Sequence, residues 1–541
     1  MTRIPVLLLL AVSILPVMIQ AQAPPFSGRW MGELGLQGET TVFRLTVPVG
    51  EPDKAVADLL PSGPTGLPIR GLSSQSSGVR FELAMEPAPL VFEGSPAGAE
   101  EIAGKVRRGE VEGGFRMIRL AEIGADRRAS LYGNYETDSG RVIWIGPFGE
   151  LGADQYVLDF ESGRFAALYP RSETVFVAGP AIVVPFFPLA VTITFQVNDK
   201  GQVTGLLYQE GDRPPVRALR RVLAREEVSF RNGDVTLAGT LTLPRKKGPH
   251  PAIVLLHGSG PEDRNFLGPW TDFFARQGLA VLAYDKRGVG ASGGDWKRSG
   301  IEDLAGDAEA AFRYLAGRTD VDRRRIGLFG ISQGGWIAPL VASRNPTIAF
   351  IVLHAGASVA VARQGEQFLE HELRAYGFSE AEIGEALAYQ RLDDEFTRTG
   401  QGWEKLQEAY RKASEAKAPW LIAELKPADD PFRTMYRKMM DFDPAPYWRQ
   451  VRCPVLALFG ELDHNVPPQP NVEILEKTLS DAGHRTHSIV ILPKANHLFL
   501  QAEMGTLAEY PRLKGFVPGY FDQLGHWLQE VLAVRRQDPP S

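Results

Sequence analysis

In the second half of the chain, short continuous apolar runs alternate with amphipathic helical segments, and no other feature limits the possible fold as much. The runs stand in "PAIVLLHG", "LAVLAYDKRG", "RIGLFGIS" and "AFIVLHAG", with "WTDFFARQ", "DLAGDAEAAFRYLAG" and "GGWIAPLVAS" as the helical segments between them. Apolar runs of this length are typical of strands that are buried on both faces of a parallel sheet. Successive parallel strands are joined by right-handed crossovers, so the sequence predicts a parallel α/β sheet.

This α/β pattern has a clear beginning and one interruption. A hairpin around Asn232 and Gly233 is predicted at its start, where "VSFRNGDVTLAGTLTLP" alternates apolar and polar residues. Over residues 358–448 the alternation stops, and helical segments follow before "CPVLALFGELD" and "HSIVILP" restore buried strands. We expect an α/β domain of residues 226–357 and 449–541, with residues 358–448 inserted as a helical cap. An insertion there lies over the carboxyl ends of the strands, where open α/β sheets bind ligands.

The first half of the chain is rich in short alternating segments. Residues 24–125 and 126–225 each hold several of them, such as "TTVFRLTV", "GVRFELAM", "RVIWIG" and "VTITFQV", with glycine and proline between them. The first stretch predicts a small barrel or a sandwich, and the second predicts a further β-rich domain or a continuation of the first. No metal-ligand cluster, paired-carboxylate motif or phosphate loop stands out in either sequence, so we expect accessory domains without chemistry of their own.

The N-terminus has the features of a signal peptide. Arg3 precedes an apolar run over residues 4–19, and Ala21 and Ala23 form the small-x-small pattern of a signal-peptidase site. Cleavage is expected after Ala23, or after Ala21 because a proline follows Ala23. The run is short and interrupted by proline and serine, and an uncleaved anchor is the alternative. We expect removal of residues 1–23 and a periplasmic or secreted bacterial protein, with no stable membrane insertion after cleavage.

Charge and cysteine content exclude some function classes. The formal net charge is −6 over 541 residues and no basic stripe is visible, which argues against a nucleic-acid partner. Cys453 is the only cysteine, so no internal disulfide can form. It precedes a proline and an apolar run, and its thiol is therefore predicted to be buried. A chain of this length exceeds one hydrophobic core, so several domains are expected.

Ser332 stands in "GISQGG", a G-x-S-x-G pattern at the junction of a predicted buried strand and a predicted helix. A serine nucleophile of this type needs a sharp turn there, and its neighbours two places away must be small for the chain to fit. Gly330 and Gly334 meet that need, and Gly335 lets the helix approach the sheet. The amino end of the helix adds a partial positive charge near the place where an oxyanion would form.

A serine hydroxyl is a poor nucleophile at neutral pH, so it needs a base and a group that orients the base. Asp463 follows the strand in "VLALFGELD", and His497 follows the next strand in "SIVILPKANH". Both strand ends are expected at the edge of the sheet that carries Ser332, and Glu461 is the runner-up for the acid. Three other histidines are weaker candidates for the base, because one adjoins the acid and two lie at the opposite end of their strand: His464, His484 and His487.

Two backbone N–H groups are needed to stabilise the oxyanion of a tetrahedral intermediate. One is expected from Gln333, the residue after the nucleophile. The other is expected from the loop after the first buried strand, "HGSG", where Ser259 is the first choice and Gly258 the second. His257, which begins this loop, is interpreted as a structural histidine.

The stretches "HGSGPEDR", "YDKRGVGASGG", "GISQGG", "GELDHNVPP" and "ANHLF" together resemble the α/β-hydrolase superfamily, over roughly Val228 to Leu532. Within it the chain is similar to the branch of dienelactone-hydrolase-like esterases and prolyl-oligopeptidase-like peptidases. "FSGRWMGELGL" also resembles the β-rich N-terminal regions of some secreted bacterial esterases. The resemblance implies a mostly parallel, doubly wound sheet with a helical cap insertion, and it places Asp285 and Arg287 in a structural turn.

We therefore expect a serine hydrolase that cleaves small-molecule carboxylic esters through an acyl-enzyme. Ser332 attacks the carbonyl carbon, His497 transfers the proton and Asp463 orients the imidazole. The mechanism needs no metal and no organic cofactor. Apolar side chains of the cap either line an acyl pocket or only dock the helices of the cap on the sheet: Phe368, Leu369, Leu373, Tyr376 and Phe378.

Three alternatives remain open at this point. A serine peptidase of the prolyl-oligopeptidase type uses the same triad, but those enzymes usually carry a β-propeller, and no repeat of about 40 to 50 residues is visible. An acyl thioester hydrolase also uses the triad, although it would be unusual for an exported protein. A non-enzymatic binding protein with a degenerate hydrolase fold requires the loss of a triad member, and all three candidates are present.

Overall fold

The computed structural model describes residues 26–534 except 61–62, 76, 99, 150, 152 and 422. The predicted signal peptide, residues 1–23, lies outside the described residues. The chain divides into two compact units. The first holds Phe43–Arg119 and the described residues before Thr40, and the second holds Thr40–Val42 and the described residues from Leu120 onward. Among the described residues, none of the helices has the length and apolar character needed to cross a bilayer.

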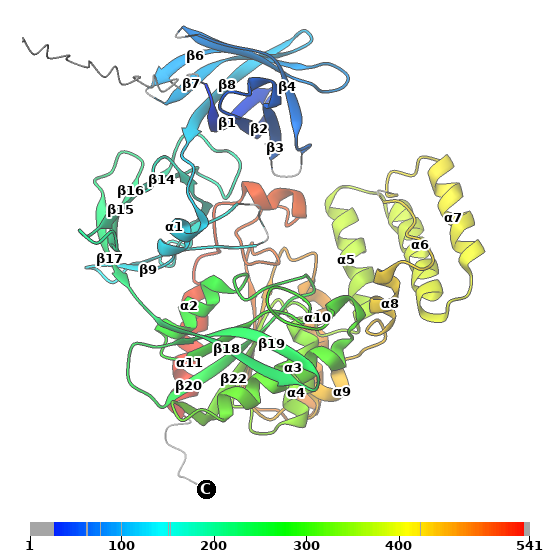
Figure 1. The fold of residues 1–541 in the computed structure, drawn as a ribbon. Coiled ribbons are helices and arrows are strands. Elements are labelled where there is room, and N and C mark those ends of the chain that lie inside the picture. Colours follow the sequence, from blue (N-terminus) through cyan, green and yellow to red (C-terminus); the bar gives the residue numbers. More distant parts are fainter. Residues whose placement is uncertain are drawn as a thin grey trace, which may run out of the picture. The chain divides into compact units, whose positions relative to one another are not determined.

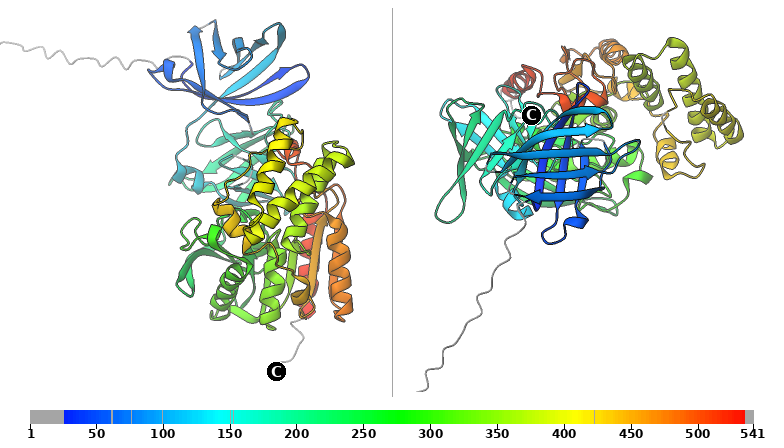
Figure 2. Two further views of the ribbon diagram at one scale, coloured as in Figure 1. Left: turned by 90° about the vertical axis from the view of Figure 1, so that its right-hand side faces the viewer. Right: turned by 90° about the horizontal axis from the view of Figure 1, so that it is seen from above.

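The first unit is a closed barrel of eight strands that follow one another in chain order (Figures 1 and 2). Phenylalanine rings fill its interior: Phe81 stacks on Phe92 with 4.5 Å between ring centroids, and Phe43 meets the edge of Phe92 at 5.4 Å. Of the two folds predicted for this stretch, the structure has the barrel. Its strands are β1 (Gly28–Leu36), β2 (Glu39–Val47), β3 (Val56–Leu60), β4 (Leu67–Gln75), β5 (Gly78–Leu83), β6 (Leu90–Gly98), β7 (Glu101–Arg108) and β8 (Val111–Leu120), with the 3-10 turn η1 (Pro52–Lys54) after β2.

A nine-stranded antiparallel sheet opens the second unit, in the order β12-β11-β10-β9-β17-β16-β15-β14-β13. Aromatic side chains of this sheet and its loops pack on the α/β domain: Phe148, in the loop after β10, stacks on Phe266 at 5.4 Å, and Phe165 lies 5.7 Å from Phe516. The second β-rich stretch therefore shares its packing with the α/β domain. The elements are α1 (Ala125–Ser130), β9 (Gly133–Thr137), β10 (Val142–Gly146), β11 (Tyr156–Asp159), β12 (Phe165–Ala167), β13 (Tyr169–Pro170), β14 (Val175–Ala178), β15 (Val191–Val197), β16 (Val203–Glu210) and β17 (Val216–Arg221).

The predicted α/β sheet is confirmed, with eight strands in the order β18-β19-β21-β20-β22-β23-β24-β25. β18 and β19 form the predicted antiparallel hairpin, in which Asn232 faces Val235 and Gly233 has a left-handed φ of 57°. From β21 to β25 every pairing is parallel. The strands are β18 (Ala224–Asn232), β19 (Val235–Leu243), β20 (His250–Leu256), β21 (Ala280–Tyr284), β22 (Val321–Ile331), β23 (Ile351–His354), β24 (Val455–Gly460) and β25 (His487–Leu492).

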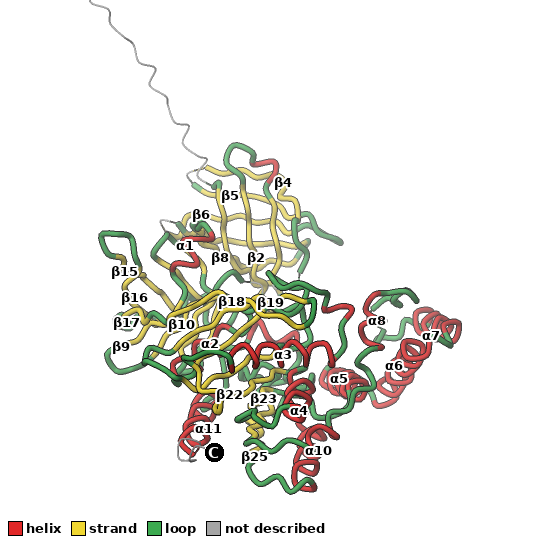
Figure 3. The backbone as a smooth tube through the Cα atoms, turned by 60° about the horizontal axis from the view of Figure 1, so that its bottom comes forward, coloured by secondary structure: helices red, strands yellow, loops and turns green. Residues whose placement is uncertain are grey.

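Helices cover both faces of this sheet (Figure 3). On one face α3 packs on β20 and β22 and against α4, and α10 packs on β24 and β25. On the other face α2 packs on β19 and β21, and the ring of Phe521 from α11 lies 5.2 Å from Phe273 of α2. Cys453 is buried, as predicted. The helices are α2 (Gly268–Arg276), α3 (Ile301–Ala316), α4 (Gly334–Arg344), α9 (Ala445–Trp448), α10 (Pro468–Asp481) and α11 (Tyr520–Val534), with the 3-10 turns η2 (Trp296–Arg298) and η3 (Leu507–Arg512).

Four helices between β23 and α9 form what we call the helical segment: α5 (Val361–Ala375), α6 (Glu380–Thr399), α7 (Trp403–Glu415) and α8 (Pro431–Arg437). It has a small apolar core of its own, in which Leu373 packs with Ile383 and Trp420. Leu369 and Phe378, which the sequence offered as pocket residues, also pack against this core. These side chains therefore hold the helices to one another.

Candidate active site

Ser332 occupies the sharp turn between β22 and α4. Its backbone lies in the left-handed region with φ of 51°, which is uncommon for any residue other than glycine. Backbone hydrogen bonds hold the turn. The Ser332 N–H donates to the His354 carbonyl at 3.0 Å, and the Ser332 carbonyl accepts from the Gly335 N–H at 2.8 Å and from the Ala357 N–H at 3.3 Å. A non-glycine residue persists in this conformation only where its surroundings enforce it, and such strain clusters at functional sites.

The glycines around Ser332 serve this turn unequally. A Cβ on Gly330 would lie 2.8 Å from the backbone of Gly334, and a Cβ on Gly335 would lie 2.5 Å from the nitrogen of Ala357. Neither glycine could be replaced without moving the backbone. At Gly334, in contrast, the nearest atom would be 3.5 Å away, an ordinary contact. The requirement for a small residue predicted at Gly334 is thus not steric in this structure, because the nearest atom, the Leu256 carbonyl oxygen, leaves room for a Cβ.

The structure brings His497 and Asp463 together at the carboxyl end of the sheet. The Nδ1–H of His497 donates to one carboxylate oxygen of Asp463 at 2.9 Å. The other oxygen accepts from the Val466 N–H at 2.8 Å, and the side chain of Asp463 is fully buried. An imidazole bonded in this way has Nδ1 as its donor, so Nε2 is left to accept a proton.

The competing histidines and the competing carboxylate have other partners. His484 precedes β25 and His487 begins it, so both lie at the amino end of that strand, as the sequence indicates. Their partners are Glu372 for His464 at 3.2 Å, the Cys453 carbonyl for His484 at 2.9 Å, Glu476 for His487 at 3.2 Å and the Lys494 N–H for Glu461 at 2.8 Å.

The backbone N–H groups of the two predicted oxyanion donors, Ser259 and Gln333, differ from that of the second choice, Gly258, in whether they already have an acceptor. The Gly258 N–H donates to the Glu262 carboxylate at 2.8 Å and is therefore occupied. In the part of the chain that the structure describes, neither the Ser259 N–H nor the Gln333 N–H has a protein acceptor. Ser259 is exposed, and Gln333 is the residue that precedes the first turn of α4. These two N–H groups remain available to a negatively charged oxygen.

Comparison with known proteins places the hydrolase-like part of the chain in a family. The model of the alpha/beta hydrolase family matches residues 253–509, which hold Ser332, Asp463 and His497. The C-terminal part of this chain is an alpha/beta hydrolase domain. Among individual proteins, esterase EstD of Thermotoga maritima is 27% identical to this chain over 344 residues, which cover 61% of this chain and 75% of the relative.

Two further proteins are similar to parts of this chain. An uncharacterized protein of Mycobacterium tuberculosis is 32% identical over 147 residues, which cover 27% of this chain and 51% of that protein. Among solved structures, the Pyrococcus furiosus esterase Pf2001 is 17% identical and covers 57% of this chain and 91% of its own, with a TM-score of 0.38.

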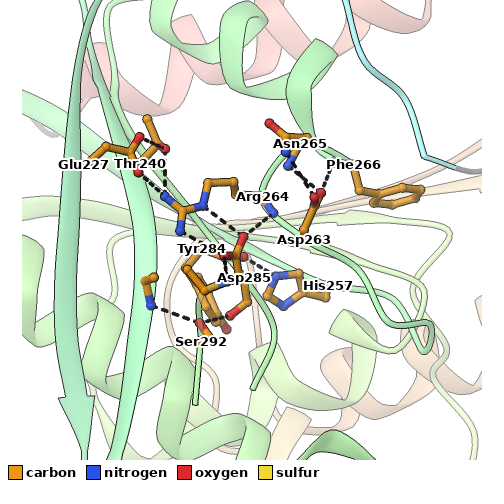
Figure 4. A network of polar contacts seen from close by, with 12 residues as sticks. Glu227, Thr240, His257, Asp263, Arg264, Asn265, Phe266, Tyr284, Asp285 and Ser292 are labelled. Carbon is orange, nitrogen blue, oxygen red and sulfur yellow. Dashed lines mark hydrogen bonds and ion pairs between the residues drawn. The ribbon is translucent and has the colours of Figure 1, made fainter. Parts of the chain in front are cut away.

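A polar network joins two loops of the hydrolase domain at Asp285 (Figure 4). The Arg264 guanidinium and the Arg264 backbone N–H donate to its carboxylate at 2.9 Å, and the Ala291 N–H donates at 2.8 Å. Burial acts to raise the pKa of Asp285, but these hydrogen bonds outweigh it and the pKa lies below its ordinary value. Both carboxylate oxygens are thus used to hold the loop after β20 against the turn after β21.

His257 belongs to the same network and stays neutral. Its Nε2–H donates to the Tyr284 carbonyl at 2.5 Å (Figure 4). Burial, together with the charge of Lys286, lowers the pKa of His257 to about 3. A histidine with this pKa and this partner is fixed in place at neutral pH and anchors the end of β20 to the end of β21.

Lys286 stands between Asp285 and Arg287, and no sequence motif singled it out. Its ammonium group contacts the "HGSG" loop of the hydrolase domain, where it donates to the carbonyls of Gly258 and Gly260. The only signal in the sequence was a lysine two residues after a buried strand. A second group missed by sequence reasoning is His354, whose carbonyl holds the Ser332 N–H and whose pKa is lowered by burial and by the charge of His497.

Proposed function

We propose that this chain hydrolyses carboxylic esters with Ser332 as the nucleophile. The observation that carries the proposal is the left-handed turn at Ser332, between a parallel strand and the helix that follows it. Such a turn projects a serine oxygen beyond the end of the sheet, as a nucleophile elbow requires. The pairing of His497 with Asp463 and the kinship with an esterase support the same reading.

The reaction that we propose is a two-step acyl transfer. His497 accepts the proton of Ser332 at Nε2 as the serine oxygen bonds to the ester carbonyl carbon. Asp463 holds the imidazole through Nδ1 and stabilises the imidazolium that forms. The N–H groups of Ser259 and Gln333 stabilise the oxyanion, the alcohol leaves with the proton from His497, and water then hydrolyses the acyl-enzyme in the same way.

We further propose that the helical segment selects among esters. The Gln364 side chain of α5 donates to the Asn465 side-chain oxygen at 3.1 Å, two residues after Asp463. The Gln333 side chain is 3.9 Å from the sulfur of Met439, just beyond α8. These contacts support a position of the segment beside both loops that carry the site. Apolar walls discriminate weakly, by about 1–3 kcal/mol per methylene, so we expect a gradual dependence on acyl chain length.

A substrate panel tests esters against peptides. We expect kcat/KM for p-nitrophenyl esters of increasing chain length to exceed that for aminoacyl anilides, because no propeller-type repeat is present in the sequence to select peptides by size. A variant with residues 361–437 replaced by a short linker should show a changed chain-length profile. Fluorophosphonate labelling of Ser332 in that variant serves as the control that the site is intact. Higher values for the anilides would replace our proposal with the peptidase, and an unchanged profile would remove the helical segment from substrate selection.

We also propose that the protein is exported and loses its signal peptide. The charged start, the apolar run and the Ala-x-Ala pattern ending at Ala23 support this. Mass spectrometry of the protein isolated from the periplasm or the medium of a bacterial host should show a mature N-terminus at Gln22 or Pro24. An exported product that still begins at Met1 would contradict cleavage.

A further inference from the structure

We propose that Lys286 is a positioning residue that sets the oxyanion hole. This inference rests on the proposed function, because it concerns the same reaction at Ser332. Lys286 does not touch the substrate in this proposal. It acts through the loop and the glutamine side chain that it holds.

All three protons of the Lys286 ammonium group have an acceptor. The Nζ atom is 2.5 Å from the Gly258 carbonyl oxygen, 2.7 Å from the Gly260 carbonyl oxygen and 3.3 Å from the Gln333 side-chain oxygen. The side chain is almost completely buried, with 2% of the residue exposed. A saturated, buried ammonium group has little freedom to move, so the three groups that it binds are held in one arrangement.

The contact with Gly258 determines where the Ser259 N–H points. In a trans peptide the carbonyl and the following N–H point in opposite directions within one plane. Because Lys286 binds the Gly258 carbonyl, the Ser259 N–H of the same peptide is directed away from Lys286. The preceding peptide is held as well, since the Gly258 N–H donates to Glu262 at 2.8 Å. The direction of one proposed oxyanion donor is therefore set from both sides.

The same ammonium group also reaches the second proposed donor. Gln333 supplies the other N–H, and its side-chain oxygen accepts from Lys286. One cation thus links the loop after β20 with the residue that follows the nucleophile, two parts of the chain that no described strand pairing joins at this point. Oxyanion stabilisation requires donors at about 2.7–3.1 Å from the oxyanion, so a fixed distance between the two donors matters for rate.

Burial of this cation is costly, which argues for a role beyond tethering a loop. Burial lowers the pKa of Lys286 to about 8, and the nearby Glu262 carboxylate opposes the shift only in part. Perturbed groups of this kind occur preferentially at functional sites.

The test compares Lys286→Met with Lys297→Met. Lys297 is a matched control because it is exposed and its ammonium group lies 5.8 Å from the ring of Trp296, as that of Lys286 does at 5.9 Å. Three quantities are measured for wild type and both variants: kcat and KM for a p-nitrophenyl ester, the rate of phosphonylation by a fluorophosphonate, and the inhibition constant of an alkyl trifluoromethyl ketone. The ketone forms a tetrahedral adduct whose oxyanion occupies the hole.

We expect Lys286→Met to lower kcat by about 10²-fold to 10³-fold, the loss typical of one oxyanion donor, with KM changed by less than about threefold. The ketone should bind more weakly by a similar factor and phosphonylation should slow in parallel, while Lys297→Met matches wild type. Thermal unfolding shows whether Lys286→Met folds. Should it fail to fold, Lys286→Gln retains an N–H donor for the loop but no charge, and we expect a loss of about tenfold or more in the same three quantities.

Several outcomes would overturn the proposal. A folded Lys286→Met or Lys286→Gln variant with wild-type kcat and ketone affinity excludes a positioning role. A variant in which only KM rises shows that the loop shapes the substrate pocket and not the oxyanion hole. Failure of the proposed function looks different, because wild type would then react with the fluorophosphonate without hydrolysing esters. In that case the phosphonylation rates of wild type and the variants still decide the role of Lys286.

Discussion

Ser332→Ala is expected to lower kcat for p-nitrophenyl esters on the order of 10⁶-fold and to abolish labelling by a fluorophosphonate. The alanine retains the Cβ but lacks the oxygen that bonds to the carbonyl carbon, so acylation has no nucleophile. Stability should change little, since the hydrogen bonds of this turn come from the backbone of Ser332 and not from its hydroxyl. Steady-state kinetics and intact-protein mass spectrometry after labelling measure the two effects.

Ser343→Ala is the matched control for this substitution. Ser343 lies on α4, the helix that begins directly after the Ser332 turn, and its hydroxyl donates to the Leu340 carbonyl at 2.8 Å. Its removal should leave both turnover and labelling near wild type. Labelling of Ser332→Ala at the wild-type rate would place the nucleophile elsewhere and would refute the assignment of Ser332.

His497→Ala is expected to lower kcat by about 10⁴-fold to 10⁶-fold, and Asp463→Asn by about 10²-fold to 10⁴-fold. Without His497 the serine keeps its proton at the moment of attack. With asparagine in place of Asp463, the amide can donate to Nδ1 and hold the imidazole in the wrong tautomer, but the ring stays near its position. The aspartate variant should therefore retain more activity than the histidine variant.

His487→Ala provides the control for the base. His487 begins the strand that leads to His497, and its imidazole pairs with Glu476 at 3.2 Å. We expect near wild-type kcat and KM for this variant, with p-nitrophenyl ester hydrolysis as the assay. An inactive His487→Ala beside a normal His497→Ala would show that the base lies at the opposite end of β25.

The α/β domain could be predicted because its strands are buried on both faces, which makes them continuous apolar runs in the sequence. The same argument placed the candidate site. Parallel strands end at one edge of the sheet, so residues that follow β22, β24 and β25 approach one another whatever the details of packing. Ser332, Asp463 and His497 were selected on that ground, and the structure brings the last two into hydrogen-bond contact.

Less of the first half could be predicted. Alternating strands have the same pattern in a barrel and in a sandwich, because each buries one face, and the closing of β1 to β8 depends on pairings between distant residues. The second sheet gave the same ambiguity. Phe148 and Phe165 pack on the α/β domain. From the sequence, the same side chains could equally have formed a separate core.

The chain order of strands, helices and polar residues thus contained the fold of the α/β domain and the edge at which the candidate site lies. It did not contain the partners of individual buried side chains. Leu373 of the helical segment packs among its own helices and not on the sheet. Lys286 binds two carbonyls and Gln333, although its place in the sequence shows only a lysine shortly after a buried strand. Periodicity along a chain records which residues are buried, whereas the partner of a buried group depends on which distant segments the tertiary structure places around it.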